Sequence, residues 1–257
     1  MILYNEEQFI ELEQDERELT DEALALMFLI LANVKSNLER ELRDFYNKYG
    51  RDGVVTYSEA RKWVGNDDHR RRLTVLLMYI SEHFDELQGD LTPEFKKMLE
   101  GVIGKEIKFF DVKSEDIADK PLNEPWGTDE KTWFDRLKDD IALWCAYILM
   151  DVKQACHRGS HIDDVIAKLN KRFKYINYVL ETLGLSESTA VGSMARRMIF
   201  HQLGIGKYQF YTKADERTCD VCGSMHGLIF PISSYEVGVT ASPLHPRCRC
   251  WEVPIVD

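Results

Sequence analysis

Residues 215–222 read Asp-Glu-Arg-Thr-Cys-Asp-Val-Cys, residues 227–230 read Gly-Leu-Ile-Phe, and residues 243–250 read Pro-Leu-His-Pro-Arg-Cys-Arg-Cys. Four of the six cysteines of the chain lie in this stretch, as two close pairs about 25 residues apart. A Cys-x-x-Cys pair can bring two thiolates to one ion, and zinc takes four sulfur or nitrogen ligands in a tetrahedron. In a segment too small to build its own core, such a site replaces the missing hydrophobic contacts. The stretch therefore predicts a small C-terminal module held together by a metal.

Five side chains are candidate ligands for a structural Zn²⁺ ion: Cys219, Cys222, His245, Cys248 and Cys250. His245 and Cys248 have good chelate spacing, whereas Cys248 and Cys250 would point to the same side of an extended strand. We expect Cys219, Cys222 and Cys248 to bind the ion, with either His245 or Cys250 as the fourth ligand. A competing interpretation is that the cysteines are reduced and metal-free and pack as small apolar residues. A third is that they form disulfides.

The composition is that of a folded protein, since 44% of the 257 residues are apolar. The formal net charge of −11 argues against a protein whose whole surface wraps nucleic acid. Residues 1–24 hold nine acids and one base. No signal peptide is visible, and the most apolar run, residues 23–34, is too short to span a bilayer. We expect a soluble protein of a reducing cytoplasm with no membrane partner, in which clustered cysteines favour metal, while Cys145 and Cys156 pack in the core.

The positions of the prolines predict long helices, because proline interrupts helix interiors. None of the seven prolines precedes Pro93, and none lies between residues 126 and 230. Apolar spacing predicts helices at about 20–50, 73–89, 92–110, 133–159, 160–169 and 176–201, with Pro93 near a helix start and a possible break at Gly184. Alternating apolar residues predict a strand at 207–212, with further short strands at 228–232 and 249–255.

These patterns indicate a mainly α fold class, with long helices and a small α+β C-terminal Cys/His module of the zinc-knuckle kind. Four regions are expected in chain order. They are an acidic, partly mobile N-terminal arm (1–22), an N-terminal helical region (23–120), a central helical region (121–206) and a β-containing Cys/His module (207–257).

The C-terminal motif resembles that of the phage minor head proteins, the Mu F-like head morphogenesis family, most strongly over residues 204–251. The matching residues are Asp215 through Cys222, Gly227, Phe230 and Pro243 through Cys250. Three departures are visible. Family members tend to have Asn where this chain has Arg247, Asp where it has His226, and Arg-Thr-Glu where it has Leu-Ser-Glu at residues 185–187. The cysteine framework is intact, so the departures put in doubt only the role of the missing arginine.

The resemblance implies a structural virion protein and no established catalysis. Family members are associated with the portal vertex inside the capsid and act in head morphogenesis and in DNA packaging, delivery and ejection. The implied partners are the portal protein, the major capsid or scaffolding protein and packaged double-stranded DNA, bound without sequence preference. The implied location is the virion, with the host cytoplasm during assembly, and expression is expected late.

Three basic runs are candidate contacts to DNA phosphates, which Lys and Arg neutralise without reading sequence: Arg70, Arg71 and Arg72; Lys171 and Arg172; Arg196 and Arg197. The competing interpretation is a solvated helix face or pairing with the many acids of the chain. Two alternative functions remain open. One is a phage-encoded nuclease or toxin-like effector built from His226, His245 and Arg217, with Asp215 or Glu216 as partner of His226. The other is a zinc-stabilised module that binds nucleic acid.

Overall fold

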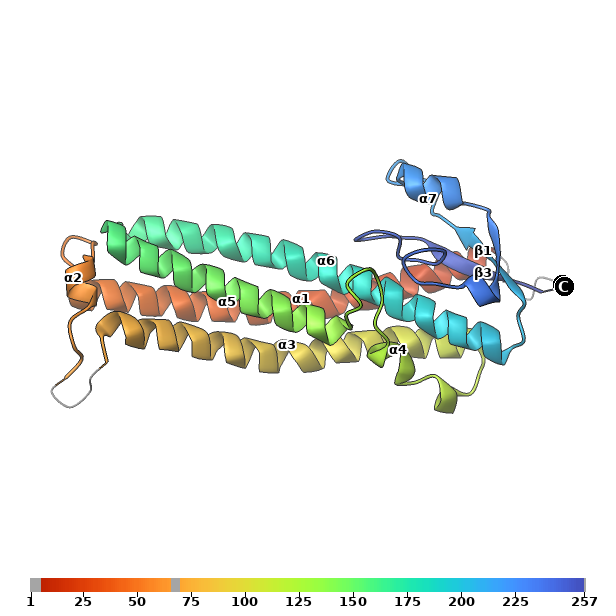
Figure 1. The fold of residues 1–257 in the computed structure, drawn as a ribbon, viewed down its shortest axis with the longest axis horizontal. Helices are drawn as coiled ribbons and strands as arrows, with labels where there is room; N and C mark the ends of the chain where they lie inside the picture. The colour runs from red at the N-terminus through yellow and green to blue at the C-terminus, as the bar shows by residue number, and fades with distance from the viewer. Residues whose placement is uncertain (1–5, 66–69, 257) are drawn as a thin grey trace. The chain divides into compact units, whose positions relative to one another are not determined.

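The structure is a computed structural model that describes residues 6–65 and 70–256, apart from the side chains of Glu6 and Asp116. The chain forms two compact units, each assembled from separated segments. We call residues 1–25, 93–136 and 180–257 the sheet unit, and residues 26–92 and 137–179 the helical unit. The elements in order are α1 (Glu6–Tyr49), α2 (Tyr57–Ala60), α3 (Arg72–Phe110), α4 (Lys120–Asn123), α5 (Trp133–Arg158), α6 (Ile162–Gln202), β1 (Lys207–Tyr211), α7 (Asp220–Met225), β2 (Ile229–Pro231) and β3 (Trp251–Ile255), with 3-10 turns at Ser114–Asp116 and Ile232–Ser234 (Figure 1).

The predicted fold class is confirmed: the protein is mainly helical, with a small antiparallel sheet near the C-terminus. The sheet has the order β2-β1-β3, and Tyr208 of β1 lies opposite Phe230 of β2 and Pro254 of β3. The three predicted strands are therefore present. Tyr208 and Phe210 are fully buried, as the alternation in β1 predicts.

The helical unit is built on the apolar stripes of four helices. Leu31 and Leu38 of α1, Ile80 of α3, Trp144 of α5 and Phe173 of α6 are all at most 3% exposed. The first four come from the spacing that predicted their helices, because residues three or four apart share one helix face. Phe173 lies in the gap between the helices predicted at 160–169 and 176–201. The predicted helix from residue 133 to 159 is confirmed as α5.

A tight loop before α2 joins the start of α6 in the helical unit. The backbone N–H of Ile162 donates to the carbonyl oxygen of Gly53, whose φ is +73°. A Cβ at Gly53 would lie 2.2 Å from the His161 ring, so the close approach also requires glycine. The Nδ1 atom of His161 accepts a hydrogen bond from the Asp163 N–H, so His161 caps the first turn of α6.

The sheet unit has an aromatic core between α1, α3 and α6. The ring of Phe9 lies 5.0 Å from that of Phe109 and 5.9 Å from that of Phe110, and Phe110 lies 5.7 Å from Phe200. Edge-to-face pairs at these distances are favourable beyond the area they bury. The core therefore joins three segments that are far apart in the sequence.

The expectation that α1 begins near Thr20 and that a partly mobile acidic arm precedes it is wrong for the described residues. Helix α1 begins at Glu6, and Phe9 and Leu12 are buried. The stripe continues through Glu16 and Thr20, which are also buried. Because two residues of the buried face are polar, a count of apolar residues alone does not detect the helical period in this segment.

Three predicted helix interruptions are also absent: at Pro93, at Gly184, and between the helices predicted at 160–169 and 176–201, whose gap lies inside α6. Helix α3 runs through Pro93, and α6 runs through Gly184 as one helix from Ile162 to Gln202. A proline ring clashes with the carbonyl four residues earlier, which here belongs to Gly89, and burial of Leu91 and Phe95 on either side holds the helix together. At Gly184 a Cβ would lie 2.8 Å from Leu24, so this glycine allows α1 to approach α6 within the sheet unit.

Candidate metal centre

The first half of the predicted metal site is the start of α7. Cys219 is the N-cap residue, and its Sγ atom accepts a hydrogen bond from the Cys222 N–H at 3.4 Å. A turn just before it is closed by Asp215, which accepts from the backbone N–H of Arg217 and from the Thr218 hydroxyl. An Asx turn followed by an N-cap sets both thiols on the same side of a single helical turn.

The second half is the turn before β3, where the backbone N–H of Cys248 donates to the carbonyl oxygen of His245. Arg247 lies in this turn with a φ of +59°, a left-handed backbone conformation that Asn adopts more readily than Arg. Its backbone N–H donates to the Ser186 hydroxyl, and its side chain binds Thr182 and Glu181, each at 2.8 Å. These contacts to α6 offset the backbone cost of placing Arg where the resemblance led us to expect Asn.

All five predicted ligands converge. The Nε2 atom of His245 lies 3.3 Å from Cys219 Sγ and 3.2 Å from Cys222 Sγ, and the Sγ atoms of Cys222 and Cys248 are 3.8 Å apart. The ligand atoms fall into two groups, Cys219, Cys222 and His245, and Cys222, Cys248 and Cys250, with all distances inside each group at most 4.8 Å. Zinc–ligand bond lengths imply S···S and S···N edges of about 3.8 and about 3.5 Å in a tetrahedron. The donor set therefore fits zinc, and the choice between His245 and Cys250 as fourth ligand stays open.

The His245 ring is oriented for metal binding. Its Nδ1 atom lies 2.9 Å from the carbonyl oxygen of Pro246, which can only accept, so Nδ1 carries a proton. In the neutral ring Nε2 then presents its lone pair to the two sulfur atoms, as the outer hydrogen bond of a metal-bound histidine does. The Pro246 carbonyl also raises the pKa of His245, although burial of the ring acts in the opposite direction.

The thiols differ in acidity because they share hydrogen bonds. The bond from Cys250 lowers the pKa of Cys248 to about 6, and burial together with the Cys248 charge raises the pKa of Cys222 to about 12. The pKa of Cys250 is raised by its hydrogen bond to Cys248 and by burial. The pKa of Cys219 is lowered by the Cys222 N–H. A buried group of thiols in which one is readily ionised suits a dication, because metal ligands must be deprotonated.

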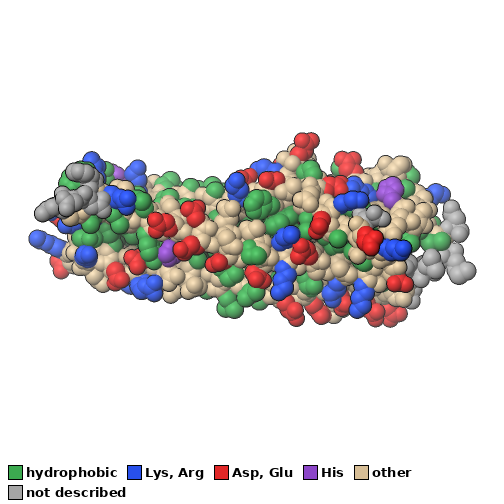
Figure 2. Space-filling model, turned by 90° about the horizontal axis from the view of Figure 1, so that it is seen from below, with side chains coloured by type: hydrophobic (Ala, Val, Ile, Leu, Met, Phe, Trp, Pro, Cys, Tyr) green, Lys and Arg blue, Asp and Glu red, His purple; other side chains and the backbone are tan. Residues whose placement is uncertain are grey.

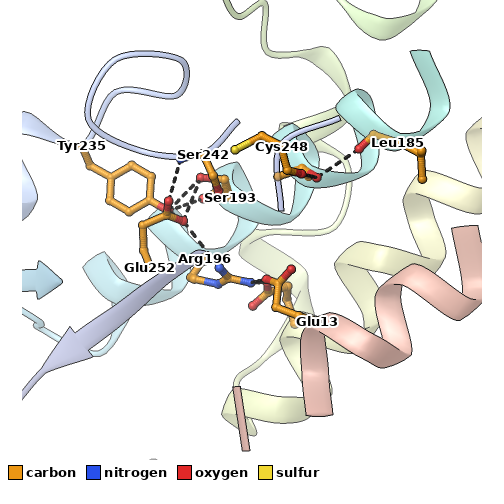
Figure 3. Close-up of polar contacts among 10 residues, drawn as sticks. Glu13, Leu185, Ser193, Arg196, Tyr235, Ser242, Cys248 and Glu252 are labelled. Atoms are coloured by element: carbon orange, nitrogen blue, oxygen red, sulfur yellow. Dashed lines mark hydrogen bonds and ion pairs between the residues drawn. The ribbon is translucent and has the colours of Figure 1, made fainter. Parts of the chain in front are cut away.

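A buried polar network fixes the module to α6 within the sheet unit (Figure 3). Glu252 of β3 is fully buried and accepts hydrogen bonds from Tyr235 at 2.8 Å, Ser193 at 3.2 Å and the Ser242 N–H at 2.6 Å. The Thr189 hydroxyl lies 3.3 Å from the Cys248 carbonyl oxygen. The ligand-bearing turn is thus held against the helix from both ends of the segment 242–252.

Arg196 of α6 lies at the centre of four glutamates. Its guanidinium binds Glu13 of α1 at 3.0 Å, Glu106 of α3 at a shorter distance, and Glu252 of β3 at 3.5 Å (Figure 3). Burial raises the pKa of Glu13 to about 7, although the charge of Arg196 acts in the opposite direction. Burial also raises the pKa of Glu16 and Glu106, and one carboxyl oxygen of each has no hydrogen-bond partner in the described structure. One guanidinium cannot balance four carboxylates, and the raised pKa values of Glu13, Glu16 and Glu106 favour their neutral forms.

The comparison with known families concerns the segment that carries this site. Residues 146–253 match the family described as Phage Mu protein F like protein. The Mu F-like segment begins inside α5, ends inside β3 and contains all five predicted ligands, and it covers less than half of the chain. The family resemblance of the C-terminal motif is therefore confirmed. No curated protein and no solved structure matches the chain.

One departure of the Mu F-like segment from the family motif has a structural counterpart. Glu187, the residue kept from Arg-Thr-Glu, is 1% exposed and accepts hydrogen bonds from Trp126 Nε1 at 2.9 Å and Arg136 Nη1 at 2.8 Å. Arg136 also binds Asp129. An arginine from outside the Mu F-like segment therefore neutralises this buried carboxylate.

The predicted DNA contacts divide into buried and exposed residues. Arg196 is 1% exposed, so its predicted contact with nucleic acid is wrong; it is a core residue. Arg172 binds Asp151 at 2.7 Å, and Arg197 binds Glu124 at 2.6 Å. Arg71 and Arg72 lie over the rings of Trp63 and Tyr49, whereas Arg70 and Lys171 are exposed.

Charge on the visible surface is mixed. On the face shown in Figure 2, Lys and Arg side chains are scattered among Asp and Glu side chains and form no continuous basic surface. Arg196 and Arg197 could not be separated from the sequence alone, because neighbouring residues on a helix face different environments. None of the helices in the described part of the chain combines the length and apolar character needed to cross a membrane.

Three residues of the predicted nuclease, His226, His245 and Asp215, are engaged in local structure. The Nδ1 atom of His226 accepts a hydrogen bond from the Thr212 N–H at 3.1 Å. Asp215 is bound by Arg249 through two hydrogen bonds of 2.6 and 2.7 Å, which hold its pKa well below the ordinary value. Arg249, and not His226, is thus the partner of Asp215.

Several residues of the site were missed in the sequence: Ser193, Tyr235, Glu106 and Glu252. Glu252 carried a signal, because it is a charged residue inside the apolar strand Trp-Glu-Val-Pro-Ile. A charge at a core position needs a partner, which would have directed attention to Arg196.

Proposed function

We propose that the chain is a minor structural protein of a tailed-phage head and acts in head morphogenesis. The observation that carries the proposal is the match of residues 146–253 to the Mu F-like family, together with convergence of the cysteines and histidine of its motif. The polar network around Glu252 supports a structural role, because it fixes the module to a long helix and leaves little freedom for movement.

The finer parts of the proposal concern location and partners. The protein would lie in the head interior at the portal vertex, contact the portal protein and the major capsid or scaffolding protein, and take part in DNA packaging and ejection. It would be made late, in the host cytoplasm. Exposed Arg70 and Lys171 could neutralise phosphates of packaged DNA, whereas the net charge of −11 limits any such contact to part of the surface.

The module would hold a structural zinc ion, bound by Cys219, Cys222 and Cys248 with His245 or Cys250. The ion, when bound, would cross-link the start of α7 to the turn before β3. The protein's own part is to place these donors by the N-cap of α7 and by the Pro246 carbonyl that orients His245.

A tagged copy of the gene, supplied to a growing phage whose own copy is deleted, tests the function. Purified heads should contain the tagged chain in a few copies, and electron microscopy of labelled heads should place it at the portal vertex. The proposal is refuted if heads form, package DNA and infect normally without the chain. It is also refuted if the purified protein degrades DNA or RNA and His226→Ala abolishes that activity.

A further inference from the structure

A cavity of about 540 Å³ lies in the sheet unit beside the Cys/His module. Its walls come from α1, α6, the segment after β1 and the start of β3. Three arginines from different parts of the chain line it: Arg17 of α1, Arg217 before α7 and Arg249 before β3. Lys213 is a fourth cation on the same wall. Guanidinium groups repel one another, so their convergence needs compensation.

The structure provides only part of that compensation. Arg249 is paired with Asp215, and Arg17 lies 3.6 Å from Asp21 in an exposed pair of the kind that contributes little. In the described part of the chain the Arg217 guanidinium and the Lys213 ammonium have neither a hydrogen-bond nor an ion-pair partner. Burial lowers the pKa of Arg17, and the charges of Arg217 and Arg249 lower it further. These groups are arranged for an anion.

The acidic residues of the lining do not cancel the cations. Glu13 is bound to Arg196, which leaves exposed Glu18 as a single carboxylate among the four cations of the lining. Burial and the neighbouring Glu106 raise the pKa of Glu16, which favours its neutral form. The positive groups are therefore the ones available to a ligand.

We infer that this cavity is a phosphate-binding site, with Arg17 and Arg217 as ligands of the phosphate oxygens and Lys213 as a further cation. A carboxylate has two oxygens and is satisfied by one guanidinium, as Asp215 is by Arg249. Several guanidinium groups around one cavity suit a group with more oxygen atoms and more charge. The phosphate could belong to a free nucleotide or to the end of a nucleic acid strand. The site does not depend on the proposed role in the phage head.

Calorimetric titration of the full chain tests the inference, with inorganic phosphate, a nucleoside monophosphate and a short oligonucleotide with or without a 5′-phosphate as probes. Arg217→Gln should weaken binding of the phosphorylated probes at least tenfold, and Arg17→Gln should weaken it similarly. Arg61→Gln, an exposed arginine of the helical unit, is the matched control and should change binding less than twofold. Thermal melting checks that each variant is folded.

The probes separate the sources of phosphate. Binding of the monophosphate, and of the oligonucleotide only when it carries the 5′-phosphate, indicates a free or terminal phosphate. Equal binding of the oligonucleotide with and without the 5′-phosphate indicates the phosphates within a strand. Either result supports the inference if Arg217→Gln removes it. The inference is overturned if no probe binds, if Arg217→Gln behaves like the control, or if an acidic peptide binds as tightly as the phosphorylated probes.

Discussion

Replacement of Arg196 by methionine should destabilise the protein much more at pH 7.5 than at pH 5. Methionine keeps an apolar stem of similar length but removes the guanidinium that binds Glu13, Glu106 and Glu252. Removal of one partner of a buried ion pair costs about 3–5 kcal/mol. That is a large part of the roughly 5–15 kcal/mol that holds a typical domain folded.

The pH dependence follows from the raised carboxyl pKa values. The pKa of Glu13 is about 7 in the folded protein and 4.5 in its unfolded reference, so the folded state binds more protons between these values. The contribution of Glu13 to the free energy of unfolding is therefore fully present below pH 4.5. It is lost as the pH rises towards and through about 7, at up to about 1.4 kcal/mol per pH unit. At pH 5 the carboxyls of the variant can take up protons, so only neutral polar groups remain buried, at about 1–3 kcal/mol each.

Urea unfolding followed by far-ultraviolet circular dichroism at both pH values measures the effect. Arg172→Met is the matched control, because Arg172 pairs with Asp151 in the helical unit but is half-buried. It should cost about 1 kcal/mol or less, with little dependence on pH. An equal loss for Arg196→Met at the two pH values, or a loss below about 1 kcal/mol at pH 7.5, would refute the reasoning.

Three further outcomes are expected. Purified, reduced protein should contain about one zinc per chain by elemental analysis, as a tetrahedral site requires. Cys222→Ala should abolish zinc binding, whereas Cys145→Ala should leave it unchanged. Comparison of the zinc content of His245→Ala and Cys250→Ala should identify the fourth ligand. Gly184→Ala should lower stability by about 1–3 kcal/mol through overpacking against Leu24, whereas Gly104→Ala, with open space around its Cβ, should raise it by about 0.5–1 kcal/mol; the opposite order in thermal melts would contradict the packing argument. Gly53→Ala should cost at least about 1 kcal/mol because of its positive φ and the His161 ring, and an unchanged melting temperature would exclude this.

Local patterns in the sequence were enough for most elements and for the ligand cluster. Helix α5, the strand β1 and the convergence of Cys219 with His245 follow from apolar period, alternation and chelate spacing. These predictions need only local information. Each depends on residues within a few turns of one another, or on a motif that already pairs two short segments.

The features that were missed depend on distant residues. Pro93 lies inside a helix because burial on both sides outweighs one lost hydrogen bond, and Gly184 continues a helix because Leu24 needs the space. Arg196 is buried because glutamates from α1, α3 and β3 meet there, which neither its own segment nor its neighbour Arg197 indicates. Tertiary partners of this kind have no local signature.

The arrangement around Arg196 limits how the Mu F-like segment can be handled as a piece. Arg196 and Glu252 lie inside residues 146–253, but Glu13 and Glu106 lie outside it. Arg136, which neutralises Glu187, also lies outside. By itself the matched segment is therefore not charge-balanced: on α6, Arg196 would keep Glu252 but lose Glu13 and Glu106, and Glu187 would lose Arg136. A separately expressed C-terminal fragment would therefore need portions of α1 and α3 and the start of α5. A fragment whose ends are chosen from the family match alone would lack the partners of two buried charged residues.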